Sequence, residues 1–218
     1  MTSLKLIGAG LSPFVRKVRI VLAEKGLAYE HEQLAPFGLS PEYKRKHPLA
    51  RIPLLETDGR PIPDSSAICA YLEKLQPQPA LYPSDPYDYA RAVWFEEFAD
   101  GGLIGGAAPV FQNRVLLPLL LKRPADESLA KKATEETLPP LFDYLERELG
   151  DNEYLVGNRF TIADVAVGSI LTQFQYGKGE IDAKRWPKLA AYLERVQGRP
   201  SFKPLIEQDR AVLKSIGA

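Results

Sequence analysis

A serine at the start of a predicted helix is the first residue whose type and place could do chemistry. Ser12 follows a short apolar run and stands directly before Pro13. The pair is typical of a helix start, because the serine hydroxyl can accept a hydrogen bond from a free backbone amide and proline fits the first helical position. The local sequence therefore favours a helix cap, and the rest of the chain must decide whether Ser12 also has a chemical role.

Two other short pairs have a similar double meaning. Ile52-Pro53 stands at the start of a predicted strand, where a trans peptide bond is the ordinary expectation. Asp64-Ser65 stands at the start of the next predicted helix, and both residues are common helix caps. An anion would also be favoured at that second place, because free amides and a hydroxyl converge on it.

Cysteine and histidine are scarce in the chain. The single cysteine, Cys69, excludes an intramolecular disulfide and a multi-cysteine zinc site, and its place on an apolar helix side indicates a small buried hydrophobe. The two histidines, His31 and His47, have no second metal-type ligand at a helical spacing. We therefore expect no metal site.

Length and composition indicate an ordinary globular protein. The chain has 218 residues, 45% of them hydrophobic and 26% charged, and its 28 basic residues balance 28 acidic ones. This balance predicts no nucleic-acid or membrane partner. The longest apolar run, residues 115–121, is interrupted by Pro118 and is too short to span a bilayer. The N-terminus carries no secretion signal, so a cytoplasmic location is expected.

The chain has two halves with different patterns. Up to about residue 78, short β-like runs alternate with helical patterns, which predicts an α/β unit. We expect strands at 4–7, near 29–34 and at 54–57, a helix that ends at Gly26, and a hairpin turn at Asp58-Gly59 before a short edge strand.

A proline-rich stretch separates the halves. Residues 76–88 hold four prolines, which is incompatible with a helix interior or a central strand. Beyond it the apolar residues recur at helical spacing, so the second half should be all helical. Thr161 and Asp164 have the spacing of a capping box, a structural role. Four glycines in residues 99–109 predict a kinked or broken helix there.

Four segments, taken in order, resemble the cytosolic glutathione transferase family. They are SPFVRKVRI at 12–20, ARIPLLE at 50–56, PIPDSSAICAYL at 61–72 and FTIADVAVGSIL at 160–171. The chain is most similar to serine-type members, as in the tau class and bacterial relatives, whereas omega-type relatives carry Cys-Pro-Phe at the first segment. The resemblance implies a thioredoxin-like glutathione-binding domain over residues 1–78 and an all-helical domain over residues 87–218 that supplies a pocket for an electrophile.

The resemblance gives Ser12 a catalytic role. A free thiol with a pKa of about 8.5 is mostly protonated at neutral pH, and lowering that pKa by about two units corresponds to roughly 2.7 kcal/mol. A hydroxyl donor at a helix N-terminus suits this task, since the free amides and the helix dipole also favour the anion. The resemblance implies that Ser12 stabilises the glutathione thiolate.

Other glutathione contacts are implied in the same way. In the family the proline of the pair Ile52-Pro53 is cis, and the backbone of the residue before it pairs with the cysteinyl part of glutathione. Ser65 would bind the γ-glutamyl carboxylate, and Asp64 would meet the γ-glutamyl amine. For the glycyl carboxylate, Arg51 is either a forked ligand or a solvated loop charge, and the two interpretations stay open.

The position before Ser40, where a lysine is frequent in the tau-like pattern, is occupied by Leu39. Lys44 and His47 are weaker substitutes for that cation. The aromatic candidates for the electrophile pocket are Phe14, Phe37 and Phe111.

The expected function is a glutathione S-transferase that uses glutathione as co-substrate and no metal, acts in detoxification on a small hydrophobic electrophile or peroxide, and forms a homodimer. A glutathione peroxidase side activity fits the same site. The alternatives are a non-catalytic member of the family, either a glutathione-binding scaffold or a transcription-associated protein, and a glutathione-dependent isomerase.

Overall fold

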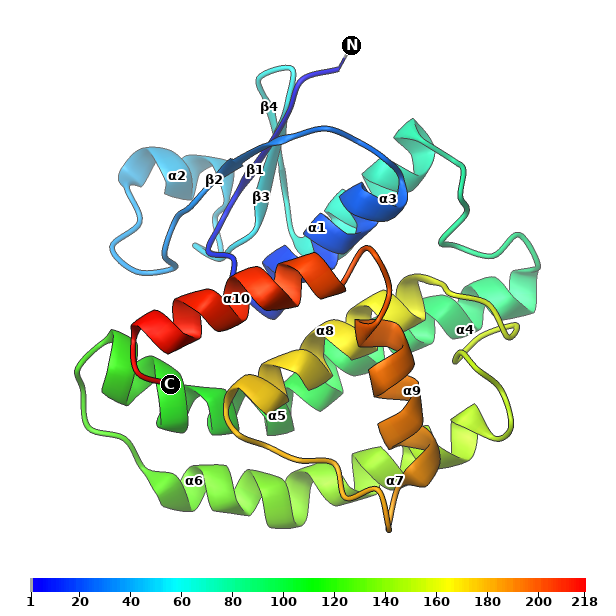
Figure 1. Cartoon of the computed structure of the whole chain (residues 1–218). Helices are drawn as coiled ribbons and strands as arrows, with labels where there is room; N and C mark the ends of the chain where they lie inside the picture. The colour runs from blue at the N-terminus through cyan, green and yellow to red at the C-terminus, as the bar shows by residue number, and fades with distance from the viewer. Residues whose placement is uncertain (1) are drawn as a thin grey trace. The chain divides into compact units, whose positions relative to one another are not determined.

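The computed structural model describes residues 2–218 and divides them into two compact units, one ending at Leu81 and the other running from Tyr82 to Ala218 (Figure 1). The division falls inside the proline-rich stretch 76–88. Each unit is described by itself below. The combination of a small mixed sheet with helices in the first unit and helices in the second confirms the predicted fold class: a thioredoxin-like domain followed by a helical one.

The first unit is a four-stranded sheet with three helices. The elements, in chain order, are β1 (Leu4–Ile7), α1 (Pro13–Glu24), β2 (Glu30–Glu32), α2 (Pro41–Lys46), β3 (Leu54–Thr57), β4 (Arg60–Pro63) and α3 (Ser65–Leu75). The strand order is β2-β1-β3-β4, with β1 and β2 parallel and the other pairs antiparallel. The strands and hairpin expected from the sequence are present, whereas helix α2 was not foreseen.

The two faces of this sheet carry different helices. Side chains alternate between the faces along a strand. From β3, Thr57 reaches one face, where its hydroxyl lies 2.9 Å from the Tyr71 hydroxyl of α3. From the same strand, Glu56 reaches the other face, where Lys46 of α2 donates a hydrogen bond to it over 2.8 Å. Helix α3 therefore covers one face together with its neighbour α1, and α2 lies on the opposite face.

Backbone conformation explains two of the turns. The helix α1 ends before Gly26, whose φ of +62° is the left-handed conformation that glycine adopts without steric cost. The β3–β4 hairpin turns at Asp58 and Gly59, both with positive φ, as a two-residue turn of the primed type requires. Both turns confirm the sequence prediction.

The second unit is helical throughout its described residues, apart from one isolated β-bridge between Val156 and Arg159. Its α-helices are α4 (Pro86–Glu97), α5 (Ile104–Phe111), α6 (Glu127–Lys132), α7 (Leu138–Leu149), α8 (Ile162–Tyr176), α9 (Pro187–Gln197) and α10 (Lys203–Ser215). Helix α8 is the core, because nearly all its residues are buried and it packs against α4, α5 and α9.

The glycine-rich stretch is irregular without being broken. A π-helical segment, Phe98–Leu103, joins α4 to α5, and a second, Gln112–Leu120, continues α5, so one helix runs from Pro86 to Leu120. The predicted irregularity is therefore present as a π-helical segment, whereas a complete break is not. Gly106 has a packing role, since a Cβ there would lie 2.6 Å from a methyl carbon of Leu138.

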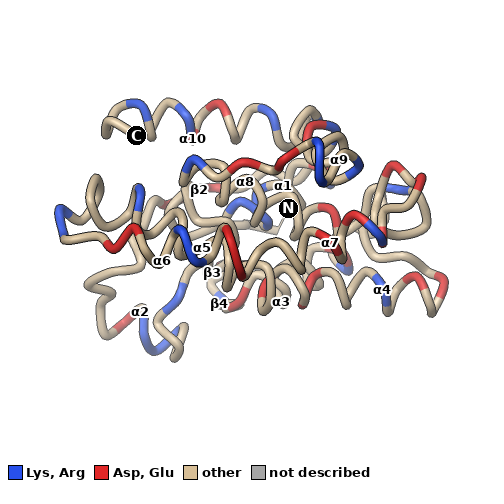
Figure 2. The backbone as a smooth tube through the Cα atoms, turned by 90° about the horizontal axis from the view of Figure 1, so that it is seen from below, with Lys and Arg blue, Asp and Glu red and all other residues tan. Residues whose placement is uncertain are grey.

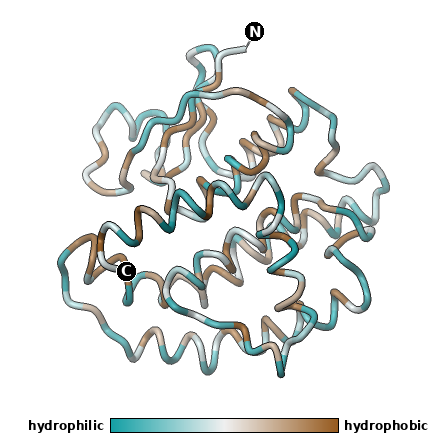
Figure 3. Tube along the Cα trace, viewed as in Figure 1, coloured by the Kyte–Doolittle hydropathy of each residue, from teal (hydrophilic) through white to brown (hydrophobic). Residues whose placement is uncertain are grey.

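This long helix is apolar enough and long enough to cross a membrane by composition alone. Core helices of globular domains pass the same test, and 39% of its most apolar window is already buried in the protein. Its contacts with α8 place it in the core of the second unit. Hydrophilic and hydrophobic residues alternate along most other helices, as expected for amphipathic elements (Figure 3).

Charge is spread along the chain. Lysine and arginine occur interspersed with aspartate and glutamate in both units (Figure 2). Several of these side chains form ion pairs on the surface, including Lys5 with Glu32 and Arg185 with Asp143. This interspersion agrees with the neutral overall balance of charge.

Candidate functional site

The end of β1, the start of β3 and the end of β4 meet at one edge of the sheet. Each of the three pairs singled out in the sequence lies next to one of these strand ends. Ile7 pairs with Leu54, and Leu54 pairs with Pro63. The chain leaves Ile7 toward Ser12, enters Leu54 from Ile52-Pro53, and leaves Pro63 toward Asp64-Ser65. Because these three positions lie in register, the sheet brings the three predicted pairs to the same edge.

A glycine that the sequence analysis did not select allows this convergence. Gly8 has φ +154°, and a Cβ there would lie 2.6 Å from a methyl carbon of Val15 and 3.2 Å from Cβ of Ile52. The bare backbone of Gly8 therefore lets the loop after β1 pass between α1 and the segment before β3. Its carbonyl oxygen lies 3.0 Å from Nε2 of His31, and Gln33 accepts the amide of Gly10, so β2 also holds this loop.

Ser12 caps α1 with only part of its hydrogen-bonding capacity. Its side chain accepts the amide of Val15 over 3.5 Å, the outer limit of a hydrogen bond, and Pro13 occupies the first helical position. A hydroxyl has two lone pairs and one hydrogen. The cap uses one lone pair, and among the described residues no acceptor takes the hydrogen. Ser12 is half-buried, so a ligand atom at the helix start could accept that hydrogen.

The segment before β3 is held from α2. The peptide bond between Ile52 and Pro53 is cis, which confirms the prediction, and both residues are buried. The hydroxyl of Tyr43 donates a hydrogen bond to the carbonyl oxygen of Arg51 over 2.7 Å. Burial raises the pKa of Tyr43 to about 12, so this donor keeps its proton at physiological pH. Tyr43 was not selected from the sequence, because helix α2 itself was missed.

The start of α3 is capped by Asp64, which leaves Ser65 outside the cap. One carboxylate oxygen of Asp64, Oδ1, accepts the amides of Ser66 over 2.8 Å and Ala67 over 3.2 Å. Asp64 has φ +74°, a conformation that non-glycine residues rarely adopt and that occurs often at binding sites. Ser65 is 4% exposed. Its amide and hydroxyl stand at the helix N-terminus, where an anion is favoured.

Arg51 and His47 share the electrostatic surroundings of Asp64. Burial lowers the pKa of His47, the Asp64 carboxylate acts against that effect, and the Arg51 guanidinium adds to it. His47 stacks on Tyr43 with ring centroids 6.3 Å apart, whereas Arg51 is exposed. The structure therefore brings Arg51 near the site and keeps His47 buried.

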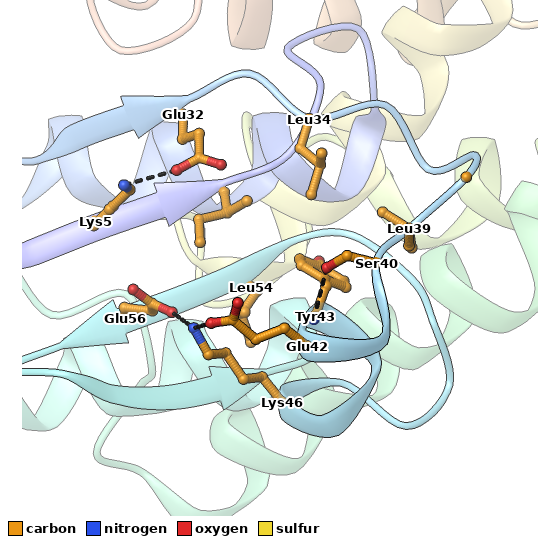
Figure 4. A pocket seen from close by; sticks show the side chains of 12 residues that line it. Lys5, Glu32, Leu34, Leu39, Ser40, Glu42, Tyr43, Lys46, Leu54 and Glu56 are labelled. Carbon is orange, nitrogen blue, oxygen red and sulfur yellow. Dashed lines mark hydrogen bonds and ion pairs between the residues drawn. The ribbon is translucent and has the colours of Figure 1, made fainter.

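Leu39 stands at the position where a lysine is frequent in the tau-like pattern, and this position lies beside a cavity. Leu39 is buried, and it lines a cavity of about 390 Å³ between α2 and the sheet (Figure 4). The charged rim of this cavity is already paired, Lys5 with Glu32 and Lys46 with two glutamates. None of Ser12, Pro53 and Ser65 lines it. The cavity therefore shares Ile7 and Leu54 with the edge where the predicted pairs converge, but is not lined by the pairs themselves.

The three aromatic candidates have different surroundings. Phe14 is half-buried in the first turn of α1, next to Ser12 in sequence, and Phe37 is 48% exposed in the loop before α2. Phe111 is 6% exposed at the end of α5, where a Cβ on Gly177 would lie 2.8 Å from its amide nitrogen. A pocket role stays a prediction for all three.

The site as a whole suits a ligand with separate anionic groups. Two helix starts, those of α1 and α3, each offer amides and a serine hydroxyl, and a cis peptide segment lies between them in the sheet register. Within residues 2–218 no group of three or more histidine, cysteine, aspartate or glutamate side chains could hold a metal ion.

Comparisons with known proteins agree with this arrangement. Residues 6–80 match the family model described as glutathione S-transferase, N-terminal domain, and residues 117–209 match the C-terminal domain model. Glutathione S-transferase U8 of Arabidopsis thaliana is 30% identical over 97% of this chain and 94% of its own. FtsZ-localized protein A of Caulobacter vibrioides is 26% identical over 90% of this chain and 87% of its own.

Among solved structures, a glutathione transferase homolog from Drosophila mojavensis with bound glutathione is 28% identical. It covers 99% of this chain and 98% of its own, with a TM-score of 0.81. The two domain models together span most of the chain, and the sheet edge holds the cis proline and both serine-bearing helix starts. The chain therefore belongs to the glutathione S-transferase family.

Proposed function

We propose that the protein is a glutathione transferase that binds glutathione across the edge of the sheet and activates its thiol with Ser12. The γ-glutamyl carboxylate lies at Ser65 and the start of α3, with Asp64 facing the γ-glutamyl amine. The backbone of Ile52 binds the cysteinyl part beside Pro53. Arg51 takes the glycyl carboxylate. Each role supplies one contact to a different part of the tripeptide.

One observation carries the proposal: the in-register pairing of Ile7, Leu54 and Pro63. This pairing supports a single ligand bridging the three segments, because each segment starts or ends at the same edge. The resemblance of the segments to the family and the glutathione-bound structural relative support glutathione as that ligand. A thiolate at the start of α1 would accept a hydrogen bond from the Ser12 hydroxyl, because the cap uses this hydroxyl only as an acceptor.

The activated thiolate would attack a small hydrophobic electrophile. The sulfur forms a bond to the electrophilic carbon, and the leaving group or a proton-accepting atom of the substrate takes the electron pair. With an organic peroxide, the same thiolate would attack the terminal oxygen and break the O–O bond, leaving an alkoxide that takes a proton to become the alcohol and a glutathione sulfenic acid. A second glutathione would convert the sulfenic acid to glutathione disulfide and water. Rate enhancement would come from holding the thiolate in place and stabilising its charge. Phe14, Phe37 and Phe111 are the proposed aromatic contacts to the acceptor.

The test is a titration of the glutathione thiol by ultraviolet difference absorbance. Bound glutathione should show a thiol pKa about two units below its free value of about 8.5, and Ser12→Ala should return the pKa toward that value. Ser40→Ala is the matched control, because Ser40 caps α2 before Pro41 in the same way, with its side chain accepting the amide of Tyr43. Absence of glutathione binding at millimolar concentration would contradict the proposal.

A non-catalytic role is the second candidate. The Caulobacter relative, at 26% identity, has a name that describes localisation with FtsZ and no reaction. Glutathione binding with an unshifted thiol pKa, and no turnover of electrophiles or peroxides, would favour this candidate. A glutathione-dependent isomerase would instead bind glutathione with a lowered thiol pKa and return it unchanged after turnover.

We further propose a cytoplasmic homodimer, as is typical of the family. Large aromatic side chains on α4 remain exposed in the single chain, with Tyr87 at 73% and Trp94 at 47%. Burying such side chains against a second copy would contribute favourable free energy. Light scattering across a hundredfold dilution tests this proposal, and a constant monomer mass would contradict it.

A further inference from the structure

A lysine inside helix α1 reaches the start of helix α3. Lys17 is 1% exposed, although an ammonium group is strongly hydrated and rarely buried without partners. Its Nζ donates a hydrogen bond to the hydroxyl oxygen of Ser66 over 3.0 Å. Ser66 is the second residue of α3, and 49 positions in the chain separate it from Lys17.

Ser66 is thereby fixed at two points. Its backbone amide is bound by the Asp64 carboxylate over 2.8 Å, and its side chain is bound by Lys17. Ser65 lies in the chain between Asp64 and Ser66. It is buried and makes the proposed γ-glutamyl contact. A carboxylate at that helix start is stabilised by the free amides and the helix dipole.

We propose that Lys17 is a positioning residue for the γ-glutamyl end of glutathione, acting through Ser66 and the first turn of α3; the proposal rests on the proposed function. Lys17 sets the place of the Ser65 hydroxyl and amide relative to α1 through its hydrogen bond to Ser66. The cysteinyl and glycyl parts are held by other segments. Loss of Lys17 should therefore weaken one end of the ligand selectively.

A second buried lysine of the same helix region provides a matched control. Lys25, directly after α1, binds Glu73 over 2.7 Å and the carbonyl oxygens of Gln76 and Pro79. It joins α1 to the far end of α3, away from Ser65. Lys25→Met removes a buried ammonium that links the same two helices. A general loosening of α1 against α3 should therefore appear in both lysine variants. A selective loss of affinity for the γ-glutamyl group should appear only in Lys17→Met.

The experiment compares two probes by isothermal titration calorimetry. S-hexylglutathione carries the γ-glutamyl group, and S-hexylcysteinylglycine lacks it while keeping the sulfur substituent and the glycyl carboxylate. The hexyl chain adds apolar area that keeps the shorter probe measurable. Lys17→Met should weaken binding of the first probe about tenfold and of the second less than about twofold. Ser66→Ala should shift the same ratio less, by about threefold, because the backbone amide at this position stays bound to Asp64.

Lys17→Arg should retain most of the affinity for S-hexylglutathione, because it keeps a hydrogen-bond donor for Ser66. Lys25→Met should leave the ratio of the two affinities unchanged. Thermal unfolding of each variant checks that it is folded, and Ser66→Ala alone decides the question if Lys17→Met does not fold. An unchanged ratio in Lys17→Met and Ser66→Ala would overturn the role of Lys17 while leaving the proposed function intact. Failure of the unmodified protein to bind either probe would overturn both proposals.

Discussion

The helix starts of α1 and α8 are both stabilised by side chains, and the two differ in how much of the side chain's hydrogen-bonding capacity is used. At α1, Ser12 accepts one long hydrogen bond from Val15, is half-buried and keeps its hydroxyl hydrogen. At α8, Asp164 is fully buried and accepts hydrogen bonds from four groups, the amides of Leu155 and Thr161 and the hydroxyls of Thr161 and Tyr192. A saturated cap, whose hydrogen bonds are all made within the protein, stabilises the fold. An unsaturated cap can still form a hydrogen bond with a ligand.

The largest expected effect is on stability at the saturated cap. Asp164→Ala should lower the free energy of unfolding by about 3 kcal/mol or more, because it leaves several buried donors without an acceptor. Urea denaturation measures the loss. Asp164→Asn, which keeps one carbonyl oxygen, should lose less. A loss below about 1 kcal/mol in the alanine variant would show that the α8 cap is not what holds this core helix in place.

The next effect is on catalysis at the unsaturated cap. Ser12→Ala should lower kcat/KM for an electrophile about a hundredfold, equal to about 2.7 kcal/mol, because thiolate stabilisation is lost. Its free energy of unfolding should fall by less than about 1 kcal/mol, since the 3.5 Å cap bond is weak. Steady-state kinetics and urea denaturation of the same preparation give both numbers. A large stability loss with unchanged kinetics would reverse the comparison.

Acid pH provides a third test of the α8 cap. Burial raises the pKa of Asp164 to about 6, whereas the unfolded value is about 3.8. The folded state therefore binds a proton first as the pH falls, so this carboxyl contributes more stability below pH 6 than above it. Between pH 7.5 and 5 the gain should be about 1 kcal/mol.

The natural protein must be compared with Asp164→Asn in this test, because His47 acts in the opposite direction. Burial lowers the pKa of His47, so the unfolded state takes up that proton more readily at acid pH. The asparagine variant retains His47 and lacks the Asp164 titration. The same pH dependence in both proteins would contradict the assignment to Asp164.

The smallest effect concerns the third cap, at α2. Ser40→Ala should cost about 1 kcal/mol of stability, because Ser40 accepts the amide of Tyr43 over 3.1 Å. Its kcat/KM should change less than about twofold. Ser40 and Ser12 both precede proline, so this variant separates the effect of a serine cap from the effect of its surroundings. A rate loss equal to that of Ser12→Ala would show that the catalytic role does not depend on the sheet edge.

Much of the fold was readable from local patterns. The short apolar run at 4–7, the Asp58-Gly59 turn and the Thr161–Asp164 box each predict structure from neighbours in sequence, and the structure confirms them. The π-helical segments and α2 were missed. A π-helix has no strong sequence signature. Helix α2 has only six residues, which is too short for a clear helical repeat, so its sequence resembles that of a loop.

The site was readable only in part. Ser12, Pro53 and Ser65 stand out through motifs that resemble the family. Gly8 and Tyr43 do not, because their roles depend on contacts across 44 and 8 positions, from Gly8 to Ile52 and from Tyr43 to Arg51. Such partners are set by strand register and helix packing, which residue type alone does not encode.

By itself the sequence determined the helix starts, the turn residues and the apolar repeats, because these depend on backbone preferences and side chains a few positions apart. The tertiary structure decided which helix start lies at the candidate site. Ser12 and Ser40 have the same local motif, and only Ser12 follows the strand whose end pairs in register with the segments carrying Pro53 and Ser65. Sheet pairing therefore places Ser12 beside both partner segments and leaves Ser40 as a cap.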